Sequence, residues 1–258
     1  MSRIHQAFEK HKAFIAFITV GDPDLATTEK VVHAAVEGGA DLIELGIPFS
    51  DPTAEGPVIM EADNRALAGG TTTDDVFALT KKLRETIDIP MVYMTYANVV
   101  FSYGTEKFMQ KAADAGIDGL ILPDVPYEEK EDFDPLATKY GLDLVSMIAP
   151  TSENRIAMIA KEAKGFVYMV SSLGVTGTRA SITTDIGAMT KFVKANTDIP
   201  CAVGFGISTP EQAKKMAALS DGAIVGSAII KLLAEYGRDA AGPVKDYVRS
   251  MADAAHSA

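Results

Sequence analysis

The sequence predicts a single (β/α)8 TIM barrel spanning residues 1–258, and three observations favour this fold class. The length of 258 residues is near the roughly 250 residues typical of such barrels. Short apolar runs alternate with longer amphipathic segments, and the runs are nearly continuous in apolar character, as expected for parallel strands buried on both faces. A Gly/Asp turn also recurs before three of these runs, at 39–43, 116–121 and 220–225, which indicates a repeated strand–helix unit.

The first expected strand, 13–20, stops at Gly21-Asp22-Pro23, and helical spacing over 27–37 follows it and ends at Gly38-Gly39. The next strand, 42–47, carries one carboxylate and breaks into a loop stiffened by prolines. The six remaining expected strands, each followed by a helix-like segment, are 91–96, 119–122, 142–149, 166–170, 201–204 and 223–225. The alternative fold, an open doubly wound sheet, usually has a Gly-rich fingerprint after its first strand, where this chain has Gly21-Asp22-Pro23.

The composition excludes several classes of partner. The formal net charge of −11 argues against nucleic acid and against an anionic membrane surface. No apolar run approaches the roughly 20 residues that cross a bilayer, and the polar N-terminus is unlike a signal peptide. The single cysteine, Cys201, lies in an apolar run and suits a reducing compartment. We therefore expect a cytoplasmic protein.

A phosphate site is expected after strands seven and eight. Strand seven runs into Gly204-Phe205-Gly206-Ile207-Ser208, and strand eight into Gly226-Ser227 just before a helical segment. Glycines let the backbone approach an anion, and a helix start offers unpaired N–H groups. Barrels often bind phosphate at this place. Neither turn contains Lys or Arg, so backbone N–H groups and the Ser227 hydroxyl would hold the anion.

Two carboxylates are candidates for acid–base chemistry. Along 42–47 the side chains alternate between faces, so Ile43 and Leu45 pack outward and Glu44 points into the top of the barrel. Partial burial there raises a carboxyl pKa toward neutrality, which suits a general acid–base. Glu55, on the following loop, reaches over the same mouth. The opposing reading, a Glu that faces solvent before an ordinary acidic turn, remains open from this stretch alone.

A lid and an apolar slot complete the expected site. The loop 171–181, long for a βα connection and rich in small residues, suits a lid that excludes water, although a plain surface loop would look the same. Apolar and aromatic residues at strand ends could form a slot for a flat aromatic group, or simply pack the core: Phe17, Met94, Tyr96, Ile121, Ile148, Tyr168 and Phe205.

The four histidines lie away from the strand ends and have no ligand spacing, so no metal site is expected.

Several motifs together resemble the tryptophan synthase α subunit family. The longest is Glu44-Leu45-Gly46-Ile47-Pro48-Phe49-Ser50-Asp51-Pro52, with Ala54, Gly56 and Pro57 after it. The others follow in family order: Tyr96-Ala97-Asn98, Asp124-Val125-Pro126, Gly174-Val175-Thr176-Gly177, Gly204-Phe205-Gly206-Ile207 and Gly226-Ser227. The resemblance covers nearly the whole chain, from Phe17 to Ser227.

The resemblance implies retro-aldol cleavage of indole-3-glycerol phosphate to indole and glyceraldehyde 3-phosphate, with no metal or cofactor on this chain. Glu44 stands at the family's general acid–base position. The phosphate positions match Gly177, Phe205, Gly206, Gly226 and Ser227, and the pocket positions match Phe17, Tyr96, Ile121, Ile148 and Tyr168. Thr176 belongs to the lid that orders the carboxylate.

The resemblance also implies an α2β2 heterotetramer, in which a β subunit carries pyridoxal phosphate and consumes the indole. The rim positions that meet the β subunit match Asp51, Pro52, Asn98, Phe101 and Pro126. One residue departs from the family pattern: the second carboxylate, an Asp in Ala-Asp-Gly-Pro, is Glu55 here. An extra methylene moves a carboxylate by more than about 1 Å, which can lower a rate about a hundredfold, unless the loop has adjusted, as we expect.

Three other readings stay open from the sequence. A barrel isomerase or epimerase acting on a sugar phosphate would share the glycine turns but does not call for the proline-rich loop 48–57. A weakly catalytic barrel that mainly binds and activates its β subunit is favoured only by Glu55. A free lyase that releases indole without a β subunit would carry the same motifs.

Overall fold

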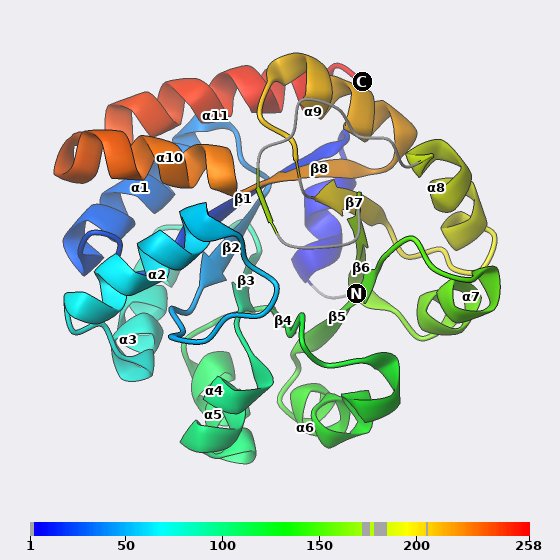
Figure 1. Ribbon diagram of the computed structural model, residues 1–258, viewed down its shortest axis with the longest axis horizontal. Coiled ribbons are helices and arrows are strands. Elements are labelled where there is room, and N and C mark those ends of the chain that lie inside the picture. The colour runs from blue at the N-terminus through cyan, green and yellow to red at the C-terminus, as the bar shows by residue number, and fades with distance from the viewer. Residues whose placement is uncertain (1–2, 172–175, 178–184, 205) are drawn as a thin grey trace.

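The computed structural model describes residues 3–171, 176–177, 185–204 and 206–258. Parallel strands close into a barrel in sequence order, β1 to β8, with β8 pairing back onto β1. Figure 1 views this barrel with helices arranged around it. The strands are β1 (Ala13–Thr19), β2 (Leu42–Gly46), β3 (Met91–Met94), β4 (Gly119–Ile121), β5 (Asp143–Ile148), β6 (Lys164–Val170), β7 (Cys201–Gly204) and β8 (Gly222–Val225). The predicted (β/α)8 fold is confirmed.

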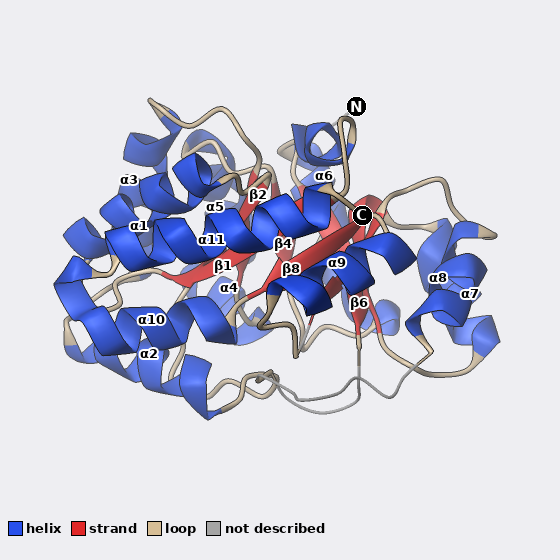
Figure 2. Cartoon of the chain, turned by 90° about the horizontal axis from the view of Figure 1, so that it is seen from above, coloured by secondary structure: helices blue, strands red, loops and turns tan. Residues whose placement is uncertain are grey.

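Helices cover the outside of the barrel (Figure 2). The α-helices are α1 (Leu25–Gly38), α2 (Pro57–Ala68), α3 (Thr73–Arg84), α4 (Ala97–Tyr103), α5 (Thr105–Asp114), α6 (Asp134–Lys139), α7 (Glu153–Lys161), α8 (Ile186–Lys194), α9 (Pro210–Leu219), α10 (Ser227–Tyr236) and α11 (Ala241–His256). The 3-10 helices are η1 (Arg3–Phe8), η2 (Tyr127–Asp132) and η3 (Gly237–Asp239). The C-terminal helix α11 packs against α1, α9 and β1. Among the described residues, no helix combines the length and the apolar character required to cross a bilayer.

Burial explains why the strand sequences are so apolar. Every residue of β1, β2, β3, β4, β7 and β8 is buried, because the inner side chains fill the barrel and the outer ones meet the helices. The strand β5 differs, since four of its six residues are only half-buried. At the N-terminal end, the fully buried Ile4 of η1 lies close to Gly119 and Gly165, so η1 closes the bottom of the barrel.

The repeated Gly/Asp turn forms the same hydrogen-bonded pair at three places on the N-terminal face. Before β2, the amide of Phe14 donates to Asp41 Oδ2 at 2.7 Å, and the amide of Asp41 donates to the Phe14 carbonyl at 2.9 Å. Asp118 is paired in this way with Met91, and Asp221 with Cys201. Each aspartate therefore ties the start of its own strand to the start of a neighbouring one.

Five of the expected strands run one or two residues past the observed strand end, and two of these ends adjoin the site. The expected strand 91–96 stops at Met94, because Tyr96 is the residue that precedes and caps α4. The expected strand 42–47 stops at Gly46, and the chain then turns into the proline-rich loop. Both ends lie at the C-terminal face of the barrel, where the backbone leaves the sheet to build the site.

Candidate active site

Glu44 lies in the interior of the barrel, with its carboxyl group at the floor of a cavity at the C-terminal face. The side chain is only 1% exposed, and within the described part of the chain neither carboxyl oxygen has a hydrogen-bond partner. Burial raises the pKa of Glu44 to about 8, because an ionised carboxylate is costly in a medium that cannot solvate it. Near neutral pH this group can therefore both donate and accept a proton.

Space beside Glu44 depends on a glycine in the same strand. Gly46 follows on the same face of β2, and the ring of Phe17 from β1 lies against it. A Cβ at position 46 would come within 2.6 Å of Phe17 Cζ. The glycine thus allows the aromatic ring to lie over the barrel axis next to the acid.

Glu55 enters the same cavity from the loop between β2 and α2. Pro57 occupies the first turn of α2 and Gly56 precedes it, so the acid stands directly before a rigid helix start. The hydroxyl of Tyr96 donates a hydrogen bond to Glu55 and accepts one from the amide of Ala54 at 3.1 Å. Burial raises the pKa of Glu55 to about 7, against the lowering effect of the Tyr96 bond.

A third buried carboxyl group, Asp63, lies behind Glu55 on α2. It is 5% exposed, and burial together with the nearby charge of Glu55 raises its pKa to about 8, although the amide of Phe49 donates to it. Sequence reasoning missed this residue. The available signal was its position on the apolar face of α2, beside the buried Ile59, Ala62 and Ala66.

The expected lid contributes two described residues to the site. The amide of Thr176 donates to the Ala54 carbonyl at 3.0 Å, and its hydroxyl accepts from the Gly56 amide at 2.8 Å. Thr176 is thus bonded to the residues on both sides of Glu55, and its role in ordering the carboxylate stays a prediction. The remaining lid positions 172–175 and 178–181 lie outside the described residues.

Opposite the carboxylates, the turns after β7 and β8 meet the cavity. Gly206 has a φ of 84°, a conformation that favours glycine. Gly226 is next to Phe17, and Ser227 begins the ten-residue helix α10. The first amides of α10 and its positive dipole end therefore border the cavity, as anion binding requires. Phe205, also predicted here, lies outside the described residues.

The empty space in this cavity, counted together with the open solvent at its mouth, is about 450 Å³. Its walls are Phe17, Glu44, Glu55, Ile59, Met94, Tyr168, Thr176, Gly177, Gly206, Ile207, Ile224, Gly226 and Ser227. The sequence did not point to Ile59 or Ile224, which are apolar and could be assigned only to the core, whereas Ile207 belongs to the turn expected to hold phosphate. Conversely, Ile121 and Ile148 are buried but do not line the cavity. Tyr96 contacts Glu55 and does not line the cavity either. Contact of these three with substrate stays a prediction.

The residues expected to meet a partner lie on the rim of the same face. Phe101 is 55% exposed and packs edge-to-face against Phe133 with the ring centroids 5.1 Å apart. Asp51, Asn98 and Pro126 are exposed and Pro52 is half-buried. An apolar side chain as exposed as Phe101 is consistent with a protein contact.

The histidines lie away from this site, as expected, but two of them are not isolated. His11 and His256 meet Asp41 on the N-terminal face, and among the described residues this is the group whose ligand atoms are close enough to hold a metal ion. Their separation in sequence, 30 residues between His11 and Asp41 and 215 between Asp41 and His256, concealed this grouping.

Comparison with known proteins agrees with this geometry. A model of the family described as tryptophan synthase alpha chain matches residues 4–256. The tryptophan synthase alpha chain of Lacticaseibacillus casei is 46% identical over 97% of this chain and 94% of its own length. The crystal structure of the alpha subunit from Legionella pneumophila has a TM-score of 0.90 at 38% identity, with full coverage of both chains. A chain of the tryptophan synthase complex from Pyrococcus furiosus has a TM-score of 0.82 at 32% identity, covering 94% of this chain and 98% of that one.

Proposed function

Because this chain belongs to the tryptophan synthase alpha chain family, we propose that Glu44 and Glu55 are its two catalytic carboxylates. The chain is a lyase that cleaves indole-3-glycerol phosphate to indole and glyceraldehyde 3-phosphate, the alpha reaction of tryptophan biosynthesis. The observation that carries the assignment is Glu44: a buried carboxyl group with no partner in the described part of the chain, facing a cavity whose far side is a helix start.

The cavity orients the substrate in one direction. The phosphate lies at Gly206, Gly226 and Ser227, where backbone amides and the α10 dipole favour an anion. The apolar walls Phe17, Ile59 and Met94 enclose the indole ring. The glycerol carbon bonded to the ring then lies between the two ends, within reach of Glu44.

Bond cleavage requires two proton transfers, and Glu44 serves both. Its protonated form donates to the indole C3, which makes the ring an electron sink with positive charge on its nitrogen. The carboxylate then removes the proton of the glycerol hydroxyl. The carbon–carbon bond breaks as the aldehyde forms, and its electron pair restores the neutral indole. A pKa of about 8 leaves both protonation states populated near neutral pH, which is what a group with two roles needs.

Glu55 stabilises the positive charge that develops on the indole nitrogen. The family's Asp at this position is one methylene shorter, and we infer that the loop has adjusted to the longer side chain. Two observations support this: Glu55 reaches the same cavity as Glu44, and Tyr96 and Thr176 hold the acid and its neighbours in place. The short contact with Tyr96 also fixes which way the carboxylate faces.

The partner, cofactor and location follow from the family. We propose an α2β2 assembly in which a β subunit, carrying pyridoxal phosphate, docks on the rim formed by Asp51, Pro52, Asn98, Phe101 and Pro126. This chain itself uses no cofactor, since acid–base groups alone balance the cleavage. The site of action is the cytoplasm.

The test is indole release from indole-3-glycerol phosphate by the purified chain, alone and with its β subunit. Glu44→Gln should lower kcat at least about a hundredfold, the usual contribution of a general acid–base. Glu55→Gln should lower it by a comparable factor, whereas Glu61→Gln, the same change at an exposed position of α2, should have no effect. Turnover that survives Glu55→Gln would show that Glu55 is not catalytic. Activation of β by a chain that releases no indole would show a binding subunit instead.

A further inference from the structure

The three aspartates that tie strand starts together on the N-terminal face differ in the cations that face them. Asp118 pairs with Arg84 at 2.8 Å and with Arg3 at 3.5 Å. Asp221 pairs with Lys194 at 2.5 Å and with Lys12 at 3.5 Å. In both places the carboxylate is compensated by side chains that stay charged at any physiological pH.

Asp41 occupies the same structural position, but two imidazoles stand where the others have Arg or Lys. Nε2 of His256 lies 2.8 Å from Asp41 Oδ2, and Nε2 of His11 lies 3.8 Å from Asp41 Oδ1. In the described part of the chain, no Arg or Lys forms an ion pair with Asp41.

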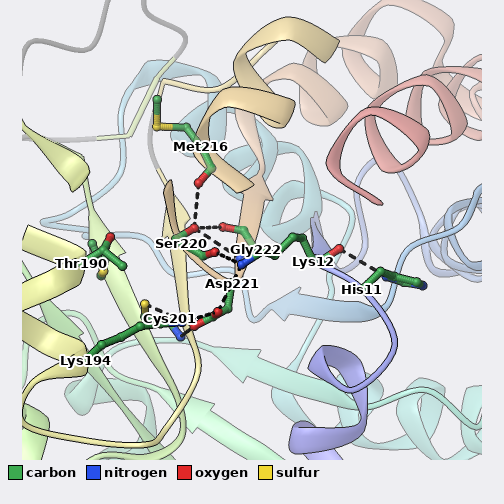
Figure 3. A network of polar contacts seen from close by, with 10 residues as sticks. His11, Lys12, Thr190, Lys194, Cys201, Met216, Ser220, Asp221 and Gly222 are labelled. Atoms are coloured by element: carbon green, nitrogen blue, oxygen red, sulfur yellow. Dashed lines mark hydrogen bonds and ion pairs between the residues drawn. The ribbon is translucent and has the colours of Figure 1, made fainter. Parts of the chain in front are cut away.

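The contact of His11 with the neighbouring backbone leaves the other ring nitrogen facing Asp41. Its Nδ1 lies 3.3 Å from the backbone carbonyl of Lys12, and a carbonyl only accepts, so Nδ1 carries the proton. The other ring nitrogen, Nε2, then faces Asp41 Oδ1 at 3.8 Å and is the atom placed to bind a metal ion. Figure 3 shows this His11–Lys12 contact at the edge of the Asp221 network, with the ring directed away from Asp221.

We propose that His11, Asp41 and His256 bind one divalent transition-metal ion of the zinc type. Two imidazole nitrogens and one carboxylate oxygen are a ligand set that Zn²⁺ accepts, with the remaining position left to water. The ligand atoms all lie within 4.8 Å of one another. The hydrogen bonds from Phe14 to Asp41 and from His11 to the Lys12 carbonyl orient two of the three ligands from outside, as is usual in metal sites.

Binding requires a small rearrangement of the two rings. Their centroids are 3.7 Å apart, and two imidazoles on one tetrahedral ion stand roughly 1.5 Å further apart than this. The side chains of His11 and His256 are 32% and 24% exposed, so both rings have room to turn. His256 is the last residue of α11. The ion would therefore join the C-terminal helix to the segments that start β1 and β2.

The experiment uses tag-free protein that has been stripped with a chelator and dialysed. Zn²⁺ binding is followed by calorimetry, Co²⁺ binding by its visible absorption, and melting temperature is measured with and without Zn²⁺. We expect one ion per chain and a melting temperature that rises with Zn²⁺ concentration, because a ligand that binds only the folded state stabilises it. His11→Ala removes one of the three direct ligands, so the rise should be lost at a Zn²⁺ concentration that saturates the parent.

Two further variants separate metal binding from the role of the histidines in packing. His256→Gln keeps an amide that can donate to Asp41 but offers no metal ligand, so it should retain the melting temperature of the stripped protein and lose the response to Zn²⁺. His33→Ala removes a histidine of α1 that lies outside the cluster and should bind Zn²⁺ like the parent. Absence of saturable binding, or equal affinity in the parent and in His11→Ala and His256→Gln, would overturn the proposal.

Discussion

Glu44→Gln should change the stability of the protein in a way that depends on pH. The pKa of this carboxyl group rises from its ordinary value of 4.5 to about 8 in the folded chain, with burial as the cause. Between these two values the unfolded chain releases a proton that the folded chain keeps. The stability that this group supports is therefore fully present below about pH 4.5 and is lost as pH rises through about 8.

The magnitude follows from the size of the shift. Each pKa unit corresponds to about 1.4 kcal/mol, so the whole shift corresponds to on the order of 5 kcal/mol, most of it lost between pH 5 and pH 8. The pKa values of Glu55 and Asp63 are raised as well, so the parent protein loses stability at alkaline pH through all three groups. Glutamine does not titrate, so the variant loses at alkaline pH only the stability that depends on Glu55 and Asp63.

The assay is equilibrium unfolding in urea at each pH from 5 to 9, for the parent, Glu44→Gln and the exposed control Glu61→Gln. The unfolding free energy of Glu44→Gln minus that of the parent should increase by on the order of 3 kcal/mol as the pH is raised from 5 to 8. The control should differ from the parent by the same small amount at every pH. A difference between Glu44→Gln and the parent that stays constant across this range would refute the burial of an ionisable acid at this position.

Three other substitutions test separate parts of the site and its support. Gly204→Ala places a Cβ 2.5 Å from the hydroxyl oxygen of Tyr168 and should cost about 1–3 kcal/mol in unfolding free energy; an unchanged melting temperature would contradict this packing. Arg65→Ala leaves Asp22, whose side chain is 1% exposed, without its bidentate partner, and should cost about 3 kcal/mol in urea unfolding. Thr176→Val removes the acceptor of a loop amide and should lower kcat/KM about fivefold, the worth of one hydrogen bond, at unchanged melting temperature.

The barrel was predictable because its strands are buried on both faces and so read as continuous apolar runs. The strand ends were less predictable, since they depend on what the chain does next. Thr95 and Tyr96 extend the buried stretch, yet Tyr96 leaves the sheet to cap α4 and to bond Glu55. A sequence pattern records the burial of Tyr96 but not that its hydroxyl meets an acid 41 residues earlier.

In the site, too, local features were predictable from the sequence and contacts between distant segments were not. The inward direction of Glu44 followed from strand alternation, which is local. The burial of Asp63 is not local, because it arises from the proline-rich loop folding over α2 and bringing the Phe49 amide to it. The cluster of His11, Asp41 and His256 joins two strand starts to the last residue of the last helix, and no spacing rule spans that distance.

The aspartate pairs on the N-terminal face have a consequence for how this enzyme can change. The catalytic face holds acids that destabilise the folded chain, and the loops there leave little freedom for substitution. The opposite face holds Asp41, Asp118 and Asp221, each joined to a neighbouring strand and remote from the substrate. Heat tolerance can thus be adjusted by exchanging the cations around these aspartates while turnover stays the same. Adaptation to temperature and adaptation of catalysis would then proceed through different sets of residues.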